Sequence, residues 1–397
     1  MPQPTSSPRE LALSGLPDAE LIISAPGRVN LLGEHVDYNM GVVLPAAIDK
    51  RLWLAVKPIE EPVLQVTSLD LNEQVNIALK DVVTRVDEKG NPLPQWSLYP
   101  AAVAWVMLSK GYSIQGMQAV IASDLPMRAG LSSSAAIEVA FALAFQTIGG
   151  IEMNRMQLAQ LCQLAENRYI GVQCGLMDQF AVSHGVARHA LFFDTRSLEW
   201  QPIPLPADTV LVIADSGRTR ELAHSAYNQR QQECQLAVQY IHRKNSNVHS
   251  LRDVTKQELA GFLDLLPEVV ARRTHHVVDE IDRVERSALA LVEDDAAAFG
   301  AFMLEGHASL RDLYDVSCDE LDYLVEAASN HIGCLGARLT GAGFGGCTIN
   351  LVQKQHAQDF CEKLQTAYQE RFLVELKTYI CHADRGAFVE RMRKAVL

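Results

Sequence analysis

The sequence lacks the short motifs of several large enzyme classes. It contains no Gly-x-x-x-x-Gly-Lys-Ser/Thr segment, which excludes a P-loop NTPase. It contains no His-Glu-x-x-His pair, the signature of many zinc metalloproteases. No Gly-x-Ser-x-Gly segment occurs either, so its serines do not form the nucleophile elbow of an α/β-hydrolase.

Several kinds of partner are also excluded, because the sequence lacks the residue patterns that they require. None of the eight cysteines forms a Cys-x-x-Cys pair, so we expect neither a zinc site nor a disulfide framework, but reduced thiols in a cytosol. The 35 Lys and Arg residues face 48 Asp and Glu, for a net charge of −13, and no basic cluster suits a nucleic-acid backbone. No apolar run is long enough to span a membrane, and the first twenty residues lack a secretory signal pattern. We expect a soluble, cytoplasmic protein with no nucleic-acid or membrane partner.

What is present is the composition of an ordinary globular protein. At 397 residues, 48% of them hydrophobic, the chain allows two or three domains and a large core. Three alternating prolines between Trp200 and Ala207 cannot continue a helix or a central strand, so we place the main boundary there, as a connection. The expected units are an N-terminal domain over 20–200 and a C-terminal domain over 207–397.

Both halves mix helices with short strands that often follow one another. Strands are expected at 21–25, 42–47, 52–57, 63–67, 75–79 and 117–123, and helices at 99–110, 135–148 and 156–170. Beyond the boundary we expect a strand at 210–214, mostly helical segments up to Ile332, a strand–turn–strand around 338–351 and a strand at 374–380. This pattern predicts an α+β fold rather than a regular parallel α/β sheet.

The stretch from Pro126 to Ile137 predicts a phosphate site. It joins an apolar strand to a helix that is apolar on nearly every side, with Glu138 as its one charged residue. A helix N-terminus presents free N–H groups and the positive end of the helix dipole to an anion. A plain serine N-cap is the alternative, but three serines behind a glycine exceed what a cap needs. The candidate phosphate-binding residues are Arg128, Ala129, Gly130, Leu131, Ser132, Ser133 and Ser134.

The segment from Pro26 to Asn39 is expected to be a ligand-binding loop. It holds Glu34, His35 and Asp37 within four residues, and Arg28 lies six residues before Glu34. Clustered carboxylates and an imidazole suit a polyhydroxylated ligand, because carboxylate oxygens accept hydrogen bonds from hydroxyl groups. A metal site or a solvated polar turn remains open for this loop on its own.

Two further candidate residues are acidic. Glu166 lies near the end of the helix expected at 156–170, and Asp178 follows the glycine-containing stretch after that helix. Such a pair could supply a metal ligand and a general base. Most acidic residues are simply exposed, which is the alternative reading. Asp178 has the apolar neighbours Met177 and Phe180, and this makes it the stronger candidate.

A glycine-rich segment near the C-terminus contains Gly341, Gly343, Gly345 and Gly346. It matches the letters of a dinucleotide-binding fingerprint, but a β-branched, strand-like run follows where that fingerprint needs a helix. We therefore expect a glycine-rich hairpin that approaches another part of the site.

Taken together, three ordered motifs resemble those of the GHMP small-molecule kinases. They are the Pro26–Asn39 segment, Gly130-Leu-Ser-Ser-Ser-Ala-Ala136 and Gly341-Ala-Gly-Phe-Gly-Gly-Cys347, with supporting stretches at 174–179 and 309–322. The Gly-Glu-His-x-Asp-Tyr-Asn form of the first motif is similar to that of members that phosphorylate galactose. The resemblance extends from about residue 20 to 390.

The resemblance implies a two-domain α+β kinase with its active site in the cleft between the domains. ATP phosphates would lie on residues 128–134, with Mg²⁺ held by Ser134 and Glu166. Asp178 would take the proton of the anomeric hydroxyl of D-galactose as it attacks the γ-phosphorus, with Arg28 beside it, giving galactose 1-phosphate. The residues implied to hold the sugar are Glu34, His35, Val36, Asp37, Gly175 and Tyr227. The chain would act as a monomer or weak homodimer.

The sequence departs from the family pattern in three places. Arg128 stands where most members carry a small residue, and Val36 replaces a usual threonine. The segment at 215–220 differs from the family form, and its Arg218 or Arg220 could pair with the carboxylate of a uronate. A kinase for galacturonate, N-acetylgalactosamine or arabinose, or a catalytically silent sugar sensor, therefore remains an alternative.

Overall fold

The structure is a computed structural model, and it describes residues 6–126, 129–218 and 223–392. Its described strands form three sheets. The six-stranded sheet has the order β13 (Phe388–Arg391), β1 (Leu21–Asn30), β3 (Pro45–Pro58), β6 (Met117–Ser123), β4 (Val63–Ser68) and β5 (Glu73–Ala78). The four-stranded sheet has the order β10 (Cys334–Leu339), β11 (Cys347–Gln353), β9 (Thr209–Asp215) and β12 (Lys377–Cys381). A small sheet joins β2 (Val42–Val43), β7 (His189–Asp194) and β8 (Trp200–Pro204). Neighbouring strands are antiparallel except β4 and β6.

The helices alternate with these strands along the chain. The N-terminal half contains α1 (Pro8–Gly15), α2 (Leu98–Ser109), α3 (Ser133–Gly149), α4 (Arg155–Ala165) and α5 (Met177–His184). The C-terminal half contains α6 (Ala223–Lys244), α7 (Lys256–Leu263), α8 (Glu268–Val292), α9 (Ala296–Ser309), α10 (Asp319–Ser329) and α11 (Ala357–Phe372). Helices α4 and α9 each run on into a π-helical turn, Glu166–Ile170 and Leu310–Tyr314. The α+β prediction is confirmed.

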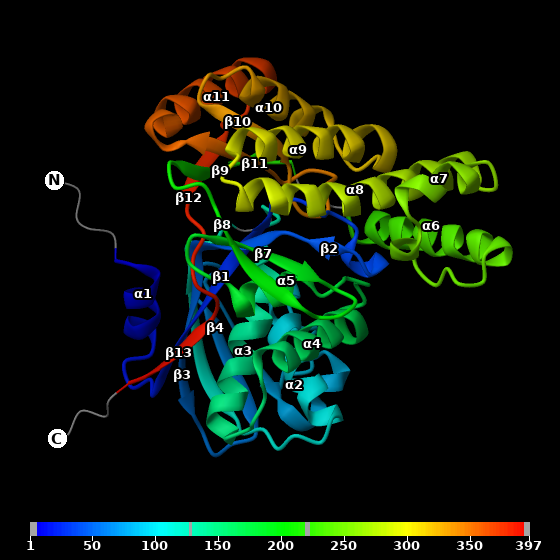
Figure 1. Cartoon of the computed structure of the whole chain (residues 1–397). Helices are drawn as coiled ribbons and strands as arrows, with labels where there is room; N and C mark the ends of the chain where they lie inside the picture. The colour runs from blue at the N-terminus through cyan, green and yellow to red at the C-terminus, as the bar shows by residue number, and fades with distance from the viewer. Residues whose placement is uncertain (1–5, 127–128, 219–222, 393–397) are drawn as a thin grey trace.

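The six-stranded sheet is covered on both faces. Helix α1 packs on β3 and β6, where Ala12, Ile22 and Val120 form a small core. Helices α3 and α5 pack on β1 and β3 from the other face, and α2 and α4 enclose α3 (Figure 1). Because α3 is surrounded in this way, almost its whole surface can be apolar, as its sequence predicts.

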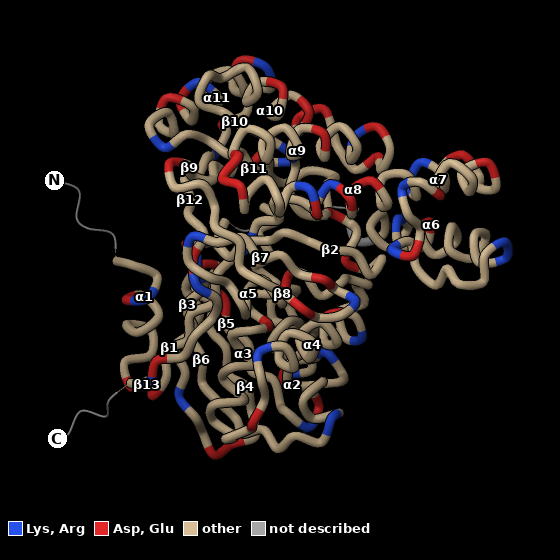
Figure 2. The backbone as a smooth tube through the Cα atoms, viewed as in Figure 1, with Lys and Arg blue, Asp and Glu red and all other residues tan. Residues whose placement is uncertain are grey.

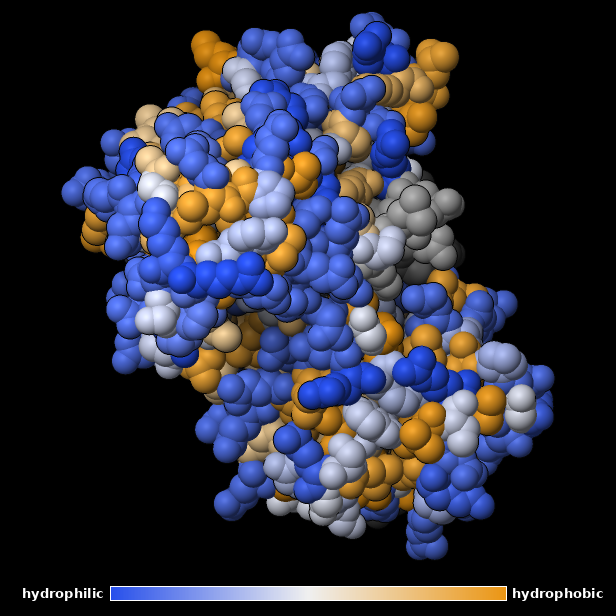
Figure 3. Space-filling model, turned by 90° about the vertical axis from the view of Figure 1, so that its right-hand side faces the viewer, coloured by the Kyte–Doolittle hydropathy of each residue, from blue (hydrophilic) through white to orange (hydrophobic). Residues whose placement is uncertain are grey.

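The C-terminal half has its own layers. Helices α9 and α10 pack on β10, and α10 and α11 share a second core with β9. The long helix α8 packs against α9 and also contacts β2 and β8 of the N-terminal half, so it joins the two halves (Figure 1). Acidic and basic residues are intermixed along the helices of this half (Figure 2). On the face seen in Figure 3, hydrophobic residues lie in small groups among hydrophilic ones.

Two local expectations are wrong. The expected loop from Pro26 does not begin there, because β1 continues to Asn30 with a bulge between Pro26 and Arg28. The proline-rich connection at 200–207 instead begins with strand β8, which is an edge strand of its sheet and so tolerates prolines that cannot donate to a neighbour.

The chain also returns to its beginning, since β13 pairs with β1. Throughout the described part of the chain, no helix combines the length and apolar character needed to cross a membrane.

Candidate active site

A two-pronged ion pair joins Arg28 on β1 to Asp178 in the first turn of α5. Arg28 Nε donates to Asp178 Oδ1 at 2.7 Å, and a terminal nitrogen donates to Oδ2 at 2.7 Å. The other terminal nitrogen donates to the carbonyl of Gly130 at 2.7 Å. Only 5% of the Arg28 side chain is exposed, against 28% for Asp178. The fork geometry fixes the orientation of the carboxylate while one side of it stays open to solvent.

The serine-rich loop begins α3 directly beside this pair. Arg28 N donates to the carbonyl of Leu131 at 3.1 Å, and a Cβ on Gly27 would lie 2.9 Å from that same carbonyl oxygen. A glycine is therefore required where the loop crosses β1. Ser132 has a φ of 55° and occupies the N-cap position of α3, but its hydroxyl does not cap the helix and donates instead to Asp178 Oδ2.

The other residues assigned to this loop surround the helix start. Ser133 and Ser134 are partly buried in the first turn of α3, Ala129 and Leu131 are buried, and Gly130 has a φ of 82°. Arg128 lies outside the described residues. The free N–H groups of α3 therefore begin next to Asp178, which is the arrangement an anion at this position needs.

Asp37 is buried against the glycine that follows α4. Its Oδ1 accepts from Tyr38 N at 2.9 Å, and a Cβ on Gly175 would lie 2.0 Å from its Oδ2. Burial raises the pKa of Asp37 to about 6, and the nearby charge of Asp178 adds to this rise. Asp37 also accepts a hydrogen bond from the backbone of Met177, the residue before Asp178, so the two aspartates are neighbours.

Tyr227 of α6, in the C-terminal half, lies beside the loop that contains Asp37. Its ring centroid lies 5.3 Å from that of His35 and 5.4 Å from that of Tyr38. Burial raises the pKa of its hydroxyl, and Asp37 adds to the effect. Val36 is fully buried, and a Cβ on Gly41 would lie 2.9 Å from its Cβ, so its side chain is a core residue of this loop.

The His35 ring joins the loop to the glycine-rich hairpin. Its Nε2 lies 3.2 Å from the carbonyl oxygen of Ala342 and must donate to it, so Nδ1 accepts from the Tyr38 hydroxyl at 2.9 Å. The Tyr38 oxygen then accepts from the Tyr314 hydroxyl at 2.7 Å. Burial lowers the pKa of His35 to about 3, so the ring is neutral near pH 7. Both ring nitrogens are occupied by these protein partners.

The glycine-rich hairpin connects β10 and β11, which pair antiparallel. All four of its glycines have positive φ: 80° at Gly341, 77° at Gly343, 125° at Gly345 and 82° at Gly346. A Cβ on Gly343 would also lie 2.2 Å from the carbonyl of Val316. Gly341 N donates to Glu34 Oε1 at 3.3 Å, so this hairpin contacts the loop that contains Glu34 and Asp37.

Glu34 is almost fully buried, and its main side-chain partner is a residue that the motifs do not reveal. Only 1% of Glu34 is exposed, and its Oε2 accepts from Arg338 of β10. The one signal in the sequence is an arginine within the short strand-like run before the glycines.

A second buried carboxylate accompanies Glu166. Gln179 Nε2 donates to Glu166 Oε2 at 2.7 Å and to Glu138 Oε2 at 3.0 Å, while Glu138 Oε1 has no hydrogen-bond partner. Burial raises the pKa of Glu166 to about 7, and it also raises the pKa of Glu138. A buried, incompletely paired carboxylate pair is chemically suited to a divalent cation. Glu138 was visible in the sequence as the lone charge of an apolar helix.

The described residues contain no ready-made cage of three or more His, Cys, Asp or Glu side chains for a metal. Mg²⁺ does not need one, because it usually takes one or two carboxylates and completes its shell with phosphate oxygens and water. The Glu166 carboxylate therefore has the chemistry that suits a magnesium ion arriving with a phosphate ligand, and Ser134 in the first turn of α3 offers a hydroxyl oxygen.

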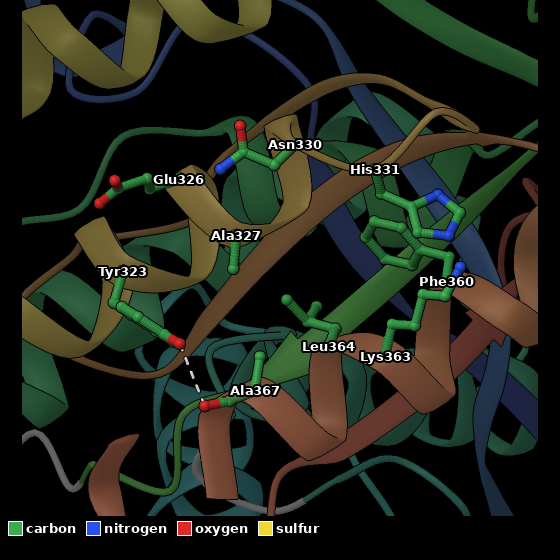
Figure 4. A pocket seen from close by; sticks show the side chains of 9 residues that line it. All are labelled: Tyr323, Glu326, Ala327, Asn330, His331, Phe360, Lys363, Leu364 and Ala367. Carbon is green, nitrogen blue, oxygen red and sulfur yellow. Dashed lines mark hydrogen bonds between the residues drawn. The ribbon is translucent and has the colours of Figure 1, made fainter. Parts of the chain in front are cut away.

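A separate hollow of about 320 Å³ lies between α10 and α11 (Figure 4). It contains none of the predicted site residues. It is lined by Tyr323, Glu326, Ala327, Asn330, His331, Phe360, Lys363, Leu364 and Ala367.

Three family models match the chain. Residues 99–186 match the GHMP kinases N terminal domain, and residues 287–370 match the GHMP kinases C terminal domain. Residues 15–58, which contain Arg28, Glu34 and Asp37, match the galactokinase galactose-binding signature. Fold and matches together define a small-molecule kinase of the GHMP type.

Comparison with individual relatives shows which family of GHMP-type kinases the chain resembles. The chain is 42% identical to the galactokinase of Roseiflexus sp. (strain RS-1) over 92% of each chain, and 40% identical to that of Chloroflexus aurantiacus over 92% of each chain. The crystal structure of Lactococcus lactis galactokinase complexed with galactose matches with a TM-score of 0.89 at 32% identity, over 96% of this chain and 98% of that chain. The chain belongs to the galactokinase family of GHMP kinases.

Proposed function

We propose that this protein transfers the γ-phosphoryl group of ATP to the anomeric hydroxyl of D-galactose, with Asp178 and Arg28 at the reacting atoms. The overall reaction is that of the galactokinase family, in which ATP is the co-substrate. The observation that carries the residue assignment is the Arg28–Asp178 fork at the N-terminus of α3. It combines an oriented carboxylate, a fixed cation and a phosphate-binding helix end.

Asp178 accepts the proton of the sugar hydroxyl or orients that hydroxyl for attack. Phosphoryl transfer needs little covalent help from the protein, so positioning and charge neutralisation supply most of the rate. Arg28 holds the carboxylate and offers positive charge next to the transferring group. The N–H groups and serines of residues 129–134 hold the phosphates of ATP.

Ser134 and Glu166 hold Mg²⁺ in this proposal. When bound, Mg²⁺ supplies positive charge to the phosphate oxygens. Glu166 is oriented by Gln179, whose amide also bonds to Glu138, so the carboxylate is held near the start of α3 before any ligand arrives.

Asp37, Glu34, Tyr227 and Gly175 form the sugar site, with His35 and Val36 shaping the loop. Two buried acids favour a neutral, hydroxyl-rich sugar over a uronate, because like charges at short range are costly. Arg218 donates to both carboxylate oxygens of Glu320, at 2.7 and 2.8 Å, which argues against its pairing with a uronate; Arg220 lies outside the described residues.

A panel of sugars with ATP tests the function. Galactose should give the highest kcat/KM, and glucose should lose roughly 1–3 kcal/mol because its C4 hydroxyl leaves a buried acceptor unpaired. A preference for galacturonate, N-acetylgalactosamine or arabinose would contradict the sugar assignment. Galactose binding without ATP consumption would instead support a silent sensor.

The organisation of the chain is also a proposal. Two domains, 20–200 and 207–397, are supported by the separate six-stranded and four-stranded sheets and by the second core that the four-stranded sheet shares with α10 and α11. None of the eight cysteines, all of which lie in the described residues, forms a disulfide bond, which fits a reducing compartment such as the cytosol. We expect a monomer or weak homodimer. Limited proteolysis should cut first near residue 207, and sedimentation equilibrium should give the mass of one or two chains.

A further inference from the structure

Arg338 on β10 is fully buried, and each of its three guanidinium nitrogens has a partner. One terminal nitrogen donates to Glu34. The other lies 3.2 Å from Glu280 Oε1 and 3.1 Å from the carbonyl of Leu31, and Nε donates to the carbonyl of Leu339 at 3.2 Å. A planar guanidinium can make these contacts at once, whereas a lysine ammonium cannot.

We propose that Arg338 is a positioning residue for the sugar: it holds the Glu34 carboxylate, from the C-terminal half of the chain, in the orientation that galactose binding requires. This inference rests on the proposed function, in which Glu34 contacts the sugar. Arg338 itself has no exposed surface, so in this proposal it acts on the sugar only through Glu34.

Other residues of the C-terminal half fix the same turn of the chain. Glu280 of α8 accepts from Gly33 N at 2.8 Å, and His276 Nε2 lies 3.3 Å from the carbonyl oxygen of Glu34. The Gly33–Glu34 turn is thus held through its amide, its carbonyl and its side chain by elements that are distant in the sequence. Gly33 has a φ of 99° and a Cβ there would lie 2.9 Å from Val43 Cα, so the turn itself has little freedom.

The charges of this cluster balance. Glu34 and Glu280 face Arg338 and Arg283, and Arg283 also donates to Glu280. A buried ion cluster stabilises a fold little more than apolar packing would, so stability alone does not account for this cluster. In this proposal the cluster serves to position Glu34. Burial raises the pKa of Glu34, and the positive charge of Arg338 opposes the rise, so Arg338 favours the carboxylate form. Removing Arg338 would favour the protonated acid, which donates where the carboxylate accepts.

Steady-state kinetics of Arg338→Met, Glu34→Gln and the double variant test the proposal. Arg338→Met should raise KM for galactose about tenfold or more, the loss expected for a misplaced charged acceptor. KM for ATP should change less than about twofold, because the phosphate loop is not touched. Arg371→Met, on the exposed face of α11, is the matched control and should leave both constants unchanged.

The double variant decides whether Arg338 acts through Glu34. If it does, Glu34→Gln and Glu34→Gln/Arg338→Met should share one galactose KM and one calorimetric Kd, because a coupled pair is non-additive. This pair of variants also serves if Arg338→Met alone fails to fold, since the double variant leaves Glu280 paired with Arg283. A further loss in the double variant, or a wild-type KM for Glu34→Gln, would overturn the inference. Absence of galactose phosphorylation by the wild type would instead overturn the proposed function.

Discussion

The carboxylate of Asp37 fills the space that a side chain on residue 175 would occupy. A Cβ built on Gly175 would lie 2.0 Å from Asp37 Oδ2 and 2.2 Å from its Cγ. The segment between Glu166 and Asp178 therefore contacts the loop that contains Asp37. The contact is at Gly175, where even the methyl group of an alanine would not fit. This contact couples the position of Asp37 to the segment that leads into Asp178.

Gly175→Ala should displace Asp37 and raise KM for galactose about tenfold or more, because a charged hydrogen-bond acceptor moves away from the sugar. KM for ATP should stay within about twofold. Gly261→Ala is the control: apart from its chain neighbours and the backbone of its own helix, nothing lies within 4 Å of a Cβ there, and alanine favours the α7 helix. An unchanged galactose KM in a folded Gly175→Ala variant would show that Asp37 does not bind the sugar.

Asp37→Asn should stabilise the unliganded protein at pH 8 but not at pH 4. Burial raises the pKa of Asp37 from 3.8 to about 6, so the folded state binds more protons than the unfolded state between these values, and stability falls as pH rises through that window. Above pH 6 the penalty is of the order of 2–3 kcal/mol, and asparagine removes it. Thermal unfolding at both pH values measures the effect. Exposed Asp264→Asn is the control, and an equal gain at pH 4 and pH 8 would contradict the account.

Arg28→Lys should lower kcat strongly while the protein stays folded. Lysine keeps one positive charge but cannot donate to both oxygens of Asp178 and to the Gly130 carbonyl together. Loss of one such transition-state contact costs about 10²–10³ in kcat. Arg243→Lys on the exposed face of α6 should have no effect. Full activity of Arg28→Lys would exclude a role for the fork.

Glu166→Gln should raise the Mg²⁺ concentration that gives half-maximal rate, because a neutral amide is a poorer ligand for a hard cation than a carboxylate. Direct Mg²⁺ titration in the presence of a non-hydrolysable ATP analogue should show the same shift. Glu370→Gln on the surface of α11 provides the matched control. If neither the rate nor the titration shifts, Glu166 does not act on the metal.

Local sequence patterns were sufficient for much of the architecture. The apolar character of α3 follows from its enclosure by other helices and the sheet, and turn chemistry identified the glycine-rich hairpin between β10 and β11. The α+β class followed from strands that succeed one another without intervening helices. Each of these features depends on residues close together in the chain.

Features that depend on distant contacts could not be read in this way. Whether Trp200–Pro204 pairs as an edge strand depends on β7, and the return of β13 to β1 depends on the whole fold. Arg338 resembles any arginine until β10 is placed against Glu34 and Glu280. Ser132 is a plausible N-cap by composition, yet its left-handed backbone turns the hydroxyl toward Asp178.

The role of Asp178 is tested most directly by Asp178→Asn, with single-turnover phosphoryl transfer and ATP-analogue binding measured on the same preparation. Asparagine preserves the shape but cannot accept the hydroxyl proton, so the rate of transfer should fall by about 10²–10⁴. Binding of the ATP analogue should remain nearly unchanged, because the phosphate loop and α3 are intact. Near-normal transfer by a folded Asp178→Asn protein would contradict the proposed role of Asp178 in the reaction.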